Sequence, residues 1–282
     1  MGNLIVKHNY LISASYRLSL TEQRIIINCI GKIRSDLPAG HQAFSVSVEE
    51  FATTHDITDK QAYFELSSAV NQLYDRYLSI DSASMPKEFR QKADINGKID
   101  VRWLSAKATY DSDQQKVYLW FSPQIMPYLS QLKQNFTKYD ISNIAKMTSA
   151  HAIRIYELLA ERQFQKYKRF SISLPALRER LQLENTHAVF GNLNSRVLAP
   201  AIRQINEYSN FVATIKTIKD GRKVIGLTFE FSIKPGKEPK RDKNRNPNKV
   251  VTEQDIKQAA RPGESREQVR NRIKKMKQAI GK

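Results

Sequence analysis

Two short segments of the chain, 126 residues apart, share one pattern of apolar and polar residues. FSVSVEEF begins at Phe44 and FSISLPAL begins at Phe170, and both alternate as short β-strands do. Short strands can look alike by chance, so the flanking elements are the stronger observation. Around both segments the patterns predict the same order: a helix before (19–34 and 149–163), a helix after (59–76 and 187–208) and then a hairpin (102–121 and 211–233). The sequence therefore predicts two domains built on one plan.

The second copy predicts a short helix, a turn and a longer helix. Ser173 is a suitable cap for a helix that has Pro175 in its first turn and ends near Leu181. Residues 183–186 form a tight connection, and the long helix runs over residues 187–208. This order is that of a helix-turn-helix, in which the second helix enters the major groove of DNA.

The long helix has one apolar side and one polar side. The apolar side gathers six residues: Phe190, Leu193, Val197, Leu198, Ala201 and Ile205. The other side has no carboxylate and presents Asn192, Ser195, Arg196 and Arg203. Arg can pair with guanine and Asn with adenine through two hydrogen bonds each, so this face suits a major groove. The same pattern also describes a surface helix whose polar side is only solvated. The helix-turn before it and the hairpin after it favour the interpretation as a DNA-binding helix.

A proline interrupts this helix, and a hairpin follows it. Pro200 has no amide hydrogen and crowds the carbonyl of residue 196, so the helix either kinks there or ends near Leu198 and begins again. The hairpin joins two alternating runs, 211–218 and 224–233, and the second run places Ile225, Leu227, Phe229 and Phe231 on one face. Its connection is Lys219-Asp220-Gly221-Arg222-Lys223, an Asp-Gly turn between cationic residues. Such a hairpin is a wing whose basic tip suits DNA phosphates.

In the first copy, the second helix carries a less cationic face. Five residues point inward: Ala62, Leu66, Ala69, Val70 and Leu73. Eight polar residues point outward: Lys60, Gln61, Glu65, Ser67, Ser68, Asn71, Gln72 and Asp75. The two acids weaken it as a DNA reader, so a solvated face and a DNA-binding face are both open. The first wing is predicted from strands 101–110 and 116–121, with Trp103, Trp120 and Phe121 in the core rather than stacked on bases.

Charge and composition restrict the partner. The 282 residues have a formal net charge of +18, and residues 234–282 hold 16 Lys and Arg against 6 Asp and Glu, a net charge of +10. This excess indicates a polyanionic partner, either nucleic acid or an anionic membrane surface. The tail either raises DNA affinity without specificity or contains a helix that binds a partner or a membrane surface. A single cysteine, Cys29, and the absence of any apolar run of roughly 18 residues favour a cytoplasmic protein.

Residue patterns that carry catalysis or hold cofactors are missing. The five histidines are scattered, no His-x-His pair occurs, and one cysteine cannot build a zinc finger. The residues after Gly221 and Gly226 do not complete a phosphate-binding loop, and they lie in a hairpin. We therefore expect no catalytic residues, no cofactor and no metal, which counts against a tyrosine-dependent rolling-circle nickase.

Five stretches carry a resemblance to a known family. They are LSLTEQRIIINCIGKI (18–33), FSVSVEEFATTHDIT (44–58), NFTKYDISNIAKMTSAHAIRIYELL (135–159), FSISLPALRERLQL (170–183) and VLAPAIRQINEYSN (197–210). In this order they resemble the Rep_3 family, the replication initiator proteins of iteron-bearing plasmids. The resemblance implies an α+β chain of two tandem winged-helix domains, which we place at residues 1–141 and 142–233. The basic, Pro/Gly/Asn-rich composition that begins at residue 234 predicts a disordered tail over 234–282 with short helices.

The resemblance also implies partners and contact residues. Such proteins bind direct repeats of double-stranded DNA at a plasmid origin, open an adjacent AT-rich region, and recruit the host initiator and the replicative helicase. Homodimers formed through the N-terminal domain bind an inverted repeat at the operator and repress the gene. In the second domain the implied DNA contacts of the long helix are Asn192, Asn194, Ser195, Arg196 and Arg203. The basic wing tip adds Lys219, Arg222 and Lys223, and the outward face of the first domain's second helix adds Lys60, Gln61, Ser67 and Asn71. A winged-helix transcriptional repressor without a replication role is the alternative.

Overall fold

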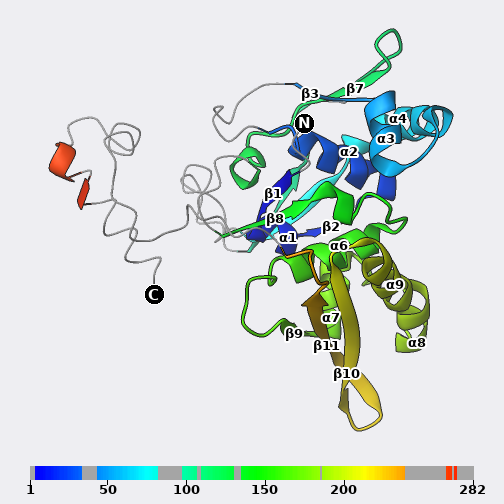
Figure 1. Cartoon of the computed structure of the whole chain (residues 1–282), viewed down its shortest axis with the longest axis vertical. Coiled ribbons are helices and arrows are strands. Elements are labelled where there is room, and N and C mark those ends of the chain that lie inside the picture. The colour runs from blue at the N-terminus through cyan, green and yellow to red at the C-terminus, as the bar shows by residue number, and fades with distance from the viewer. Residues whose placement is uncertain are drawn as a thin grey trace. The chain divides into compact units, whose positions relative to one another are not determined.

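The first winged-helix domain follows the predicted plan in the computed structural model (Figure 1). The structure describes residues 4–33, 43–81, 97–106, 109–129, 135–184, 186–238, 265–268 and 270–271, without the side chains of residues 71, 81 and 109. The domain's elements are α2 (Leu20–Ile30), β3 (Phe44–Ser47), α3 (Val48–His55), α4 (Asp59–Leu73), β6 (Thr109–Asp111) and β7 (Lys116–Leu119). Its sheet has the antiparallel order β3-β7-β6, so the wing is the β6–β7 hairpin.

The second domain repeats this topology. Its elements are α6 (Ala150–Ala160), β9 (Arg169–Ser173), α7 (Leu174–Leu181), α8 (Phe190–Leu193), α9 (Ala199–Tyr208), β10 (Phe211–Asp220) and β11 (Lys223–Ile233). The sheet order is β9-β11-β10, in which β9 corresponds to β3 and the β10–β11 hairpin corresponds to β6–β7. The two winged-helix domains predicted from the repeated segments are thus confirmed. The boundary at residue 142 stays a prediction.

Helices α2, α6 and α7 each begin at a serine cap, near the start that the sequence predicts. The Ser19 hydroxyl accepts a hydrogen bond from the backbone N–H of Glu22, whose carboxylate accepts one from the Ser19 N–H, and this capping box starts α2. The hydroxyls of Ser149 and Ser173 cap α6 and α7 by accepting hydrogen bonds from the N–H groups of Ala152 and Ala176, and Pro175 lies in the first turn of α7. These local signals need no tertiary partner, so they can be read from sequence.

The first strand predicted for the wing, residues 101–110, is correct only in part. Leu104 forms an antiparallel bridge with Phe121 and Thr109–Asp111 pairs with β7, but residues 101–102 belong to another sheet. Residues Lys98–Arg102 form β5, which pairs with β4 (Tyr77–Asp81) in a separate sheet of order β2-β4-β5, where β2 is Ser15–Tyr16. The chain then turns at Trp103, which is fully buried edge-on against the Tyr16 ring, and only Thr109–Asp111 pairs with β7. An alternating pattern predicts a strand but not the strand with which it pairs, and β5 pairs with β4. The buried positions of Trp103 and Phe121 confirm them as core residues.

The N-terminal segment is built into the fold. β1 (Leu4–His8) pairs with β8 (Phe136–Asp140), and α1 (Asn9–Ser13) lies between β1 and β2. Two 3₁₀ turns, Met126–Tyr128 and Ile141–Asn143, flank β8. The segment therefore joins strands from far along the chain.

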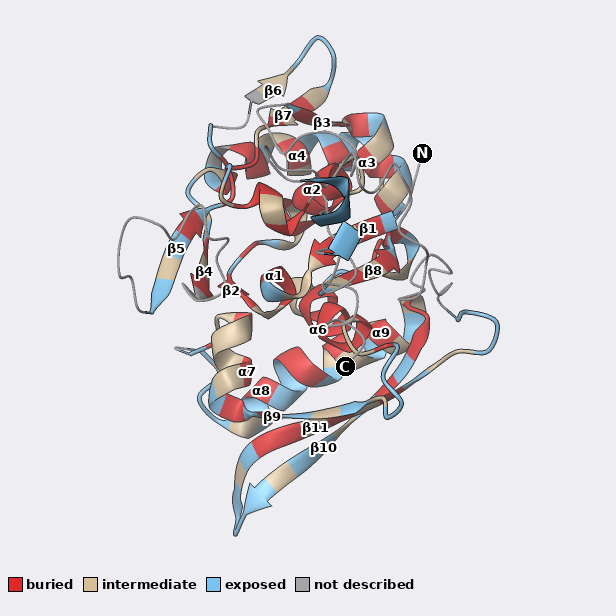
Figure 2. Cartoon of the chain, turned by 90° about the vertical axis from the view of Figure 1, so that its left-hand side faces the viewer, coloured by how far each residue is buried: buried red, intermediate tan, exposed pale blue. Residues whose placement is uncertain are grey.

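Helices α2 and α6 lie at the centre of the fold and are buried on almost every side, as Figure 2 shows by their colour. Their polar side chains are buried as well, including Glu22, Arg24, Asn28, Arg154 and Glu157. A buried charge is costly unless it is paired and hydrogen-bonded. Glu22 is paired with Arg76, and the Arg76 Nε lies 2.9 Å from the Glu22 carboxylate.

The described part of the tail is short. Ser265 caps the helical residues 266–268 and 270–271: its hydroxyl accepts from the Gln268 N–H, and its own N–H donates to the Gln268 side chain. Residues 239–264, for which disorder is expected, lie outside the described residues. No described helix combines the length and apolar character needed to cross a membrane.

Candidate nucleic-acid interface

The long helix of the second domain passes Pro200 by widening. It begins at Phe190, three residues after the predicted start, and changes to a π-helical segment over Asn194–Leu198 before α9 begins at Ala199. The Ala199 N–H donates to the Asn194 carbonyl, five residues back. The proline ring crowds the carbonyl four residues before it, and a wider turn leaves it room. The backbone stays in the right-handed helical region at Asn194, Leu198 and Ala199, so the helix continues without a break.

The two sides of this helix are arranged as the sequence predicts. Leu193, Val197, Leu198, Ala201 and Ile205 are buried, and Phe190 is half-buried. All five residues implied as DNA contacts are exposed: Asn192, Asn194, Ser195, Arg196 and Arg203. The exposed face thus offers two guanidinium groups, two amides and a hydroxyl.

Polar contacts hold the α9 part of this helix in place. The Asn206 side chain exchanges two hydrogen bonds with the Ala213 backbone on β10, at 3.0 and 2.7 Å. Gln204 bonds the N–H and hydroxyl of Thr148, just before α6. The Lys234 ammonium donates to the carbonyls of Asn206 and Ser209, where a cation complements the C-terminal end of the helix dipole. The helix is therefore fixed to the wing and to the first helix of its own domain.

The second wing ends in a two-residue turn, Gly221 and Arg222, between the paired residues Asp220 and Lys223. Gly221 has a φ of 55°, a left-handed conformation that glycine adopts without strain. The predicted phosphate contacts Lys219, Arg222 and Lys223 are all exposed at this tip. The tip therefore presents three cations together with one acid, Asp220.

One residue predicted on the buried face of the wing is exposed. Leu227, Phe229 and Phe231 are buried, but Ile225 is 42% exposed. β9 pairs with β11 only from Gly226 to Glu230, and the register between the wing strands shifts at Ile218 and Lys219. Ile225 lies beyond the part of the wing that β9 flanks, so β9 does not cover it.

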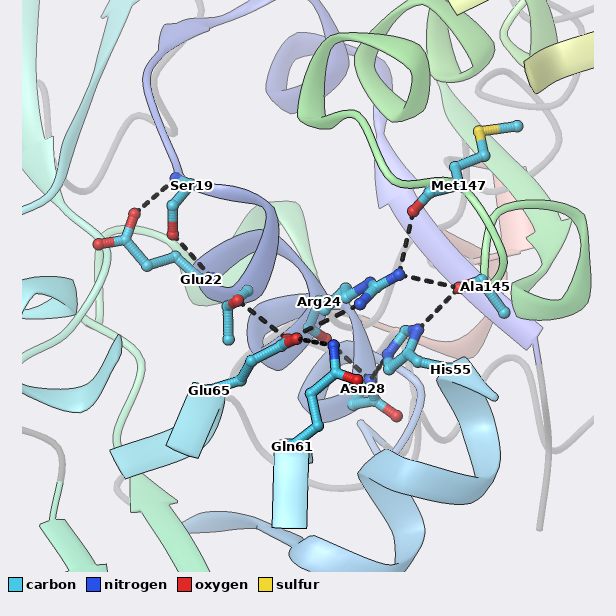
Figure 3. Close-up of polar contacts among 10 residues, drawn as sticks. Ser19, Glu22, Arg24, Asn28, His55, Gln61, Glu65, Ala145 and Met147 are labelled. Atoms are coloured by element: carbon cyan, nitrogen blue, oxygen red, sulfur yellow. Dashed lines mark hydrogen bonds and ion pairs between the residues drawn. The ribbon is translucent and has the colours of Figure 1, made fainter. Parts of the chain in front are cut away.

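In the first domain, α4 corresponds to the α8–α9 helix of the second domain. One of the acidic side chains of α4 faces inward. Figure 3 shows Glu65 between α4 and α2: its carboxylate accepts from Thr21 and Gln61 and lies 3.7 Å from the Arg24 guanidinium. Arg24 also donates to the carbonyls of Ala145 and Met147. The expectation that Glu65 points outward and opposes DNA is wrong, because Arg24 and its neighbours engage this carboxylate.

The same region holds a buried histidine. His55, at the end of α3, contacts the Ala145 carbonyl through Nδ1 at 3.0 Å and Asn28 Nδ2 through Nε2 at 2.9 Å. Because the Asn28 amide also donates to the Arg24 carbonyl, it acts as a donor to His55, and the ring is neutral with its proton on Nδ1. Burial lowers the pKa of His55 to about 4.

The predicted contact residues of α4 differ in how available they are. Lys60 and Gln61 are exposed, although the Gln61 amide donates to Glu65. Ser67 is half-buried and donates to the Phe64 carbonyl, and the Asn71 side chain lies outside the described residues. Sequence analysis passed over Tyr63 and Phe64, which are 43% and 58% exposed. The sequence signal for this exposed pair was the position of two aromatic residues outside the inward stripe of Ala62, Leu66 and Ala69.

Helix α4 and the α8–α9 helix lie on one side of the molecule in the view of Figure 1. This is the right-hand side of the two winged-helix domains, with the β6–β7 hairpin above and the β10–β11 hairpin below. Among the described residues, no group of three or more His, Cys, Asp or Glu could hold a metal ion. The exposed groups offer hydrogen bonds and positive charge.

Two family models match the chain. The model described as "Initiator Replication protein, WH1" matches residues 4–160, and the model described as "Initiator Rep protein, WH2" matches residues 173–231. The chain belongs to the Rep3 family of replication initiators. The first model covers the first winged-helix domain and extends through α6. The second model covers the second domain from residue 173 onward.

This Rep3 initiator is similar to proteins of Escherichia coli and to a solved structure. A replication initiation protein of Escherichia coli is 28% identical over 240 residues, which cover 83% of this chain and 71% of the relative. An uncharacterized 27.6 kDa protein of Escherichia coli is 24% identical over 247 residues, covering 81% and 93%. The crystal structure of the Pi initiator protein in complex with iteron DNA superposes with a TM-score of 0.69 at 23% identity, covering 83% of this chain and 98% of that one. This likeness shows the same fold.

Proposed function

We propose that this Rep3 initiator binds the direct repeats of a plasmid origin as a sequence-specific, double-stranded DNA-binding protein, without catalysing a reaction on the DNA. The observation that carries the proposal is the exposed face of the α8–α9 helix beside the basic wing tip. Arg196, Asn192 and Asn194 read base edges in the major groove, where Arg and Asn have matching partners. Lys219, Arg222 and Lys223 contact phosphates beside that groove.

Two further observations support this assignment. The net charge of +18 gives the long-range attraction to DNA that a binding protein of this size uses. The Pi initiator, which shares this fold over most of the chain, was crystallised with iteron DNA. The first domain adds contacts from Lys60, Gln61, Ser67 and Asn71 on α4, on the same side as the second reader helix.

The later steps follow from the family. Bound initiators help to open an adjacent AT-rich region and recruit the host initiator and the replicative helicase. A homodimer formed through the N-terminal domain binds an inverted repeat at the operator and represses the gene. The protein acts in the cytoplasm, where the plasmid is.

Footprinting of the purified full-length chain on the DNA flanking its gene tests the proposal. We expect protection of tandem repeats, and protection that ignores sequence would reject it. Arg196→Ala should weaken discrimination at one base position by about 1–3 kcal/mol. Arg169→Ala is the matched control, because Arg169 is an exposed arginine on β9, outside both the reader helix and the wing tip.

A repressor without a replication role would share this interface. Supplying the protein in trans to a plasmid that carries only the origin separates the two functions. Maintenance of that plasmid supports an initiator, whereas operator repression without maintenance supports the repressor. Incubation of supercoiled origin DNA with the protein and Mg²⁺ should yield no relaxed product, and relaxation would point to a nickase.

A further inference from the structure

The turn between the two helices of the motif is much longer in the second domain than in the first. Three residues, 56–58, separate α3 from α4, whereas eight residues, 182–189, separate α7 from α8. The shorter turn is closed by Thr58, whose hydroxyl caps α4. The longer turn ends at Val189, an apolar residue without a capping hydrogen bond. The start of the second reader helix is therefore set by something other than its own cap.

A single side chain donates hydrogen bonds to four carbonyl groups of this longer turn. The Arg178 guanidinium, on α7, donates through one terminal nitrogen to the carbonyls of Leu183 at 3.3 Å and Thr186 at 2.8 Å. Its other terminal nitrogen donates to the carbonyls of His187 at 2.7 Å and Ala188 at 3.1 Å. A planar guanidinium has donors in a fixed fork and no acceptor, so it suits four converging carbonyls.

The turn needs this support because its backbone is strained at two positions. Gln182 and His187 both have a φ of 53°, a left-handed conformation that costs a non-glycine residue free energy. Hydrogen bonds to the carbonyls of His187 and Ala188 hold the chain in the path that leads into Phe190. The direction in which α8 leaves the turn thus depends on Arg178.

The repeat in the sequence supplies an internal comparison. The offset of 126 residues places Ala52 opposite Arg178, Asp56 opposite Gln182 and Ile57 opposite Leu183. The backbones match, because Asp56 and Gln182 are both left-handed helix ends, and the carbonyls of Ala52 and Arg178 accept from the corresponding N–H groups. Only the side chain differs: a small buried alanine accompanies the short turn, and an arginine accompanies the long one.

We propose that Arg178 is a positioning residue for DNA reading, which sets where the second reader helix begins and how it presents Asn192 and Arg196. Its four carbonyl acceptors occupy the terminal N–H groups, so it acts through the helix rather than by touching DNA. The inference rests on the proposed function, since it assigns a role in that same reading step.

The test uses the full chain and two substitutions that keep the charge, Arg178→Lys and Arg180→Lys. Arg180 is the control because it lies on the same helix, is also half-buried and makes no hydrogen bond to the described residues of the turn. Each variant is titrated with a duplex that carries the origin repeat and with a scrambled duplex, over a series of salt concentrations. Lysine has one compact ammonium and cannot reach four carbonyls.

For Arg178→Lys we expect affinity for the repeat to fall about tenfold or more, because hydrogen bonds from a charged donor are lost. Affinity for the scrambled duplex and the salt slope should stay as in the wild type, because the charge is kept. Arg180→Lys should keep full discrimination. Amide hydrogen exchange should speed up over residues 186–193 in Arg178→Lys and stay unchanged in β10 and β11.

Three results would overturn the assignment. These are discrimination and exchange equal to the wild type, an equal loss for both duplexes, or failure of Arg178→Lys to fold, since a residue that only positions the reader leaves the core intact. Failure of the proposed function is a separate result, because the wild type itself would then bind the repeat and the scrambled duplex equally.

Discussion

The Lys7 Nζ atom lies 2.5 Å from Oε1 of Glu157, although 150 residues separate them and both side chains are buried. The same carboxylate accepts a hydrogen bond from the Tyr139 hydroxyl at 2.6 Å and one from Arg154 at 3.4 Å. Burial favours the neutral acid, but Lys7, Arg154 and Tyr139 hold the pKa of Glu157 below its ordinary value. One carboxylate thus joins β1, β8 and α6, and ties the N-terminal segment to the second domain's first helix.

Replacing Glu157 with Gln should destabilise the fold strongly. The substitution keeps the shape but leaves Lys7 and Arg154 buried without a negative partner, at a cost of about 3–5 kcal/mol in the free energy of unfolding. Urea unfolding of the full chain measures it. The double variant Lys7→Met with Glu157→Gln should recover part of the loss, since one unpaired charge is gone. A double variant no more stable than Glu157→Gln would contradict this account.

Stability should fall in mild acid because of His55. Burial lowers the pKa of this ring to about 4, below the 6.5 of an exposed histidine. The unfolded chain therefore binds a proton at higher pH than the folded one, so the contribution is full above about pH 6.5 and is lost as pH falls toward about 4. It amounts to about 3 kcal/mol, since each pH unit of difference is worth about 1.4 kcal/mol. Unfolding at pH 7 and pH 5 measures the decline.

The control for His55 is His55→Gln, a neutral side chain that can donate and accept. Burial also lowers the pKa of His8 and His151, so the wild type has other groups that titrate in this range. The difference between wild type and variant isolates His55, and we expect a smaller decline between pH 7 and pH 5 for His55→Gln. Equal declines would remove His55 from the explanation.

Local signals were the part of the fold that sequence predicted well. The capping box of Ser19 and Glu22 and the cap at Ser173 depend on neighbours within three residues, so the helices begin as predicted. The start of the reader helix did not follow this rule. Phe190 begins it because Arg178 draws the preceding carbonyls together, and no residue near 187 signals that contact.

Pairing between distant segments could not be predicted. The alternating pattern of residues 101–110 does not identify its partner, and the pairing of β5 with β4 was recognised only in the structure. Lys7 and Glu157 are charged residues of a kind that is usually exposed, and their burial depends on each other. Glu65 was expected on the solvated side for the same reason, because the Arg24 that engages it comes from another helix. In each case the deciding contact lies far away in the sequence.

Gly226 should not tolerate a side chain. A Cβ there would lie 2.9 Å from the Ile172 carbonyl oxygen, because β9 passes close to β11 at this position. Gly226→Ala should therefore destabilise the wing sheet by about 1–3 kcal/mol, the usual cost of overpacking. Gly191→Ala is the matched change: Gly191 lies in α8 with nothing within 4 Å of its Cβ, so alanine should be neutral or slightly stabilising. Thermal unfolding of both variants checks the pair, and similar shifts would refute the close-contact explanation.

The tip of the second wing should set part of the salt dependence of DNA binding. Each phosphate contact releases a counterion, so Lys219→Ala and Arg222→Ala should each reduce the slope of log K against log salt by about 0.9. Affinity should fall alike for repeat and scrambled duplexes, because phosphates are the same in both. Lys216 is the control: it is exposed on β10 but lies 2.7 Å from the Glu230 carboxylate, and Lys216→Ala should change the slope less. If all three substitutions changed the slope equally, the tip would have no special place on the phosphates.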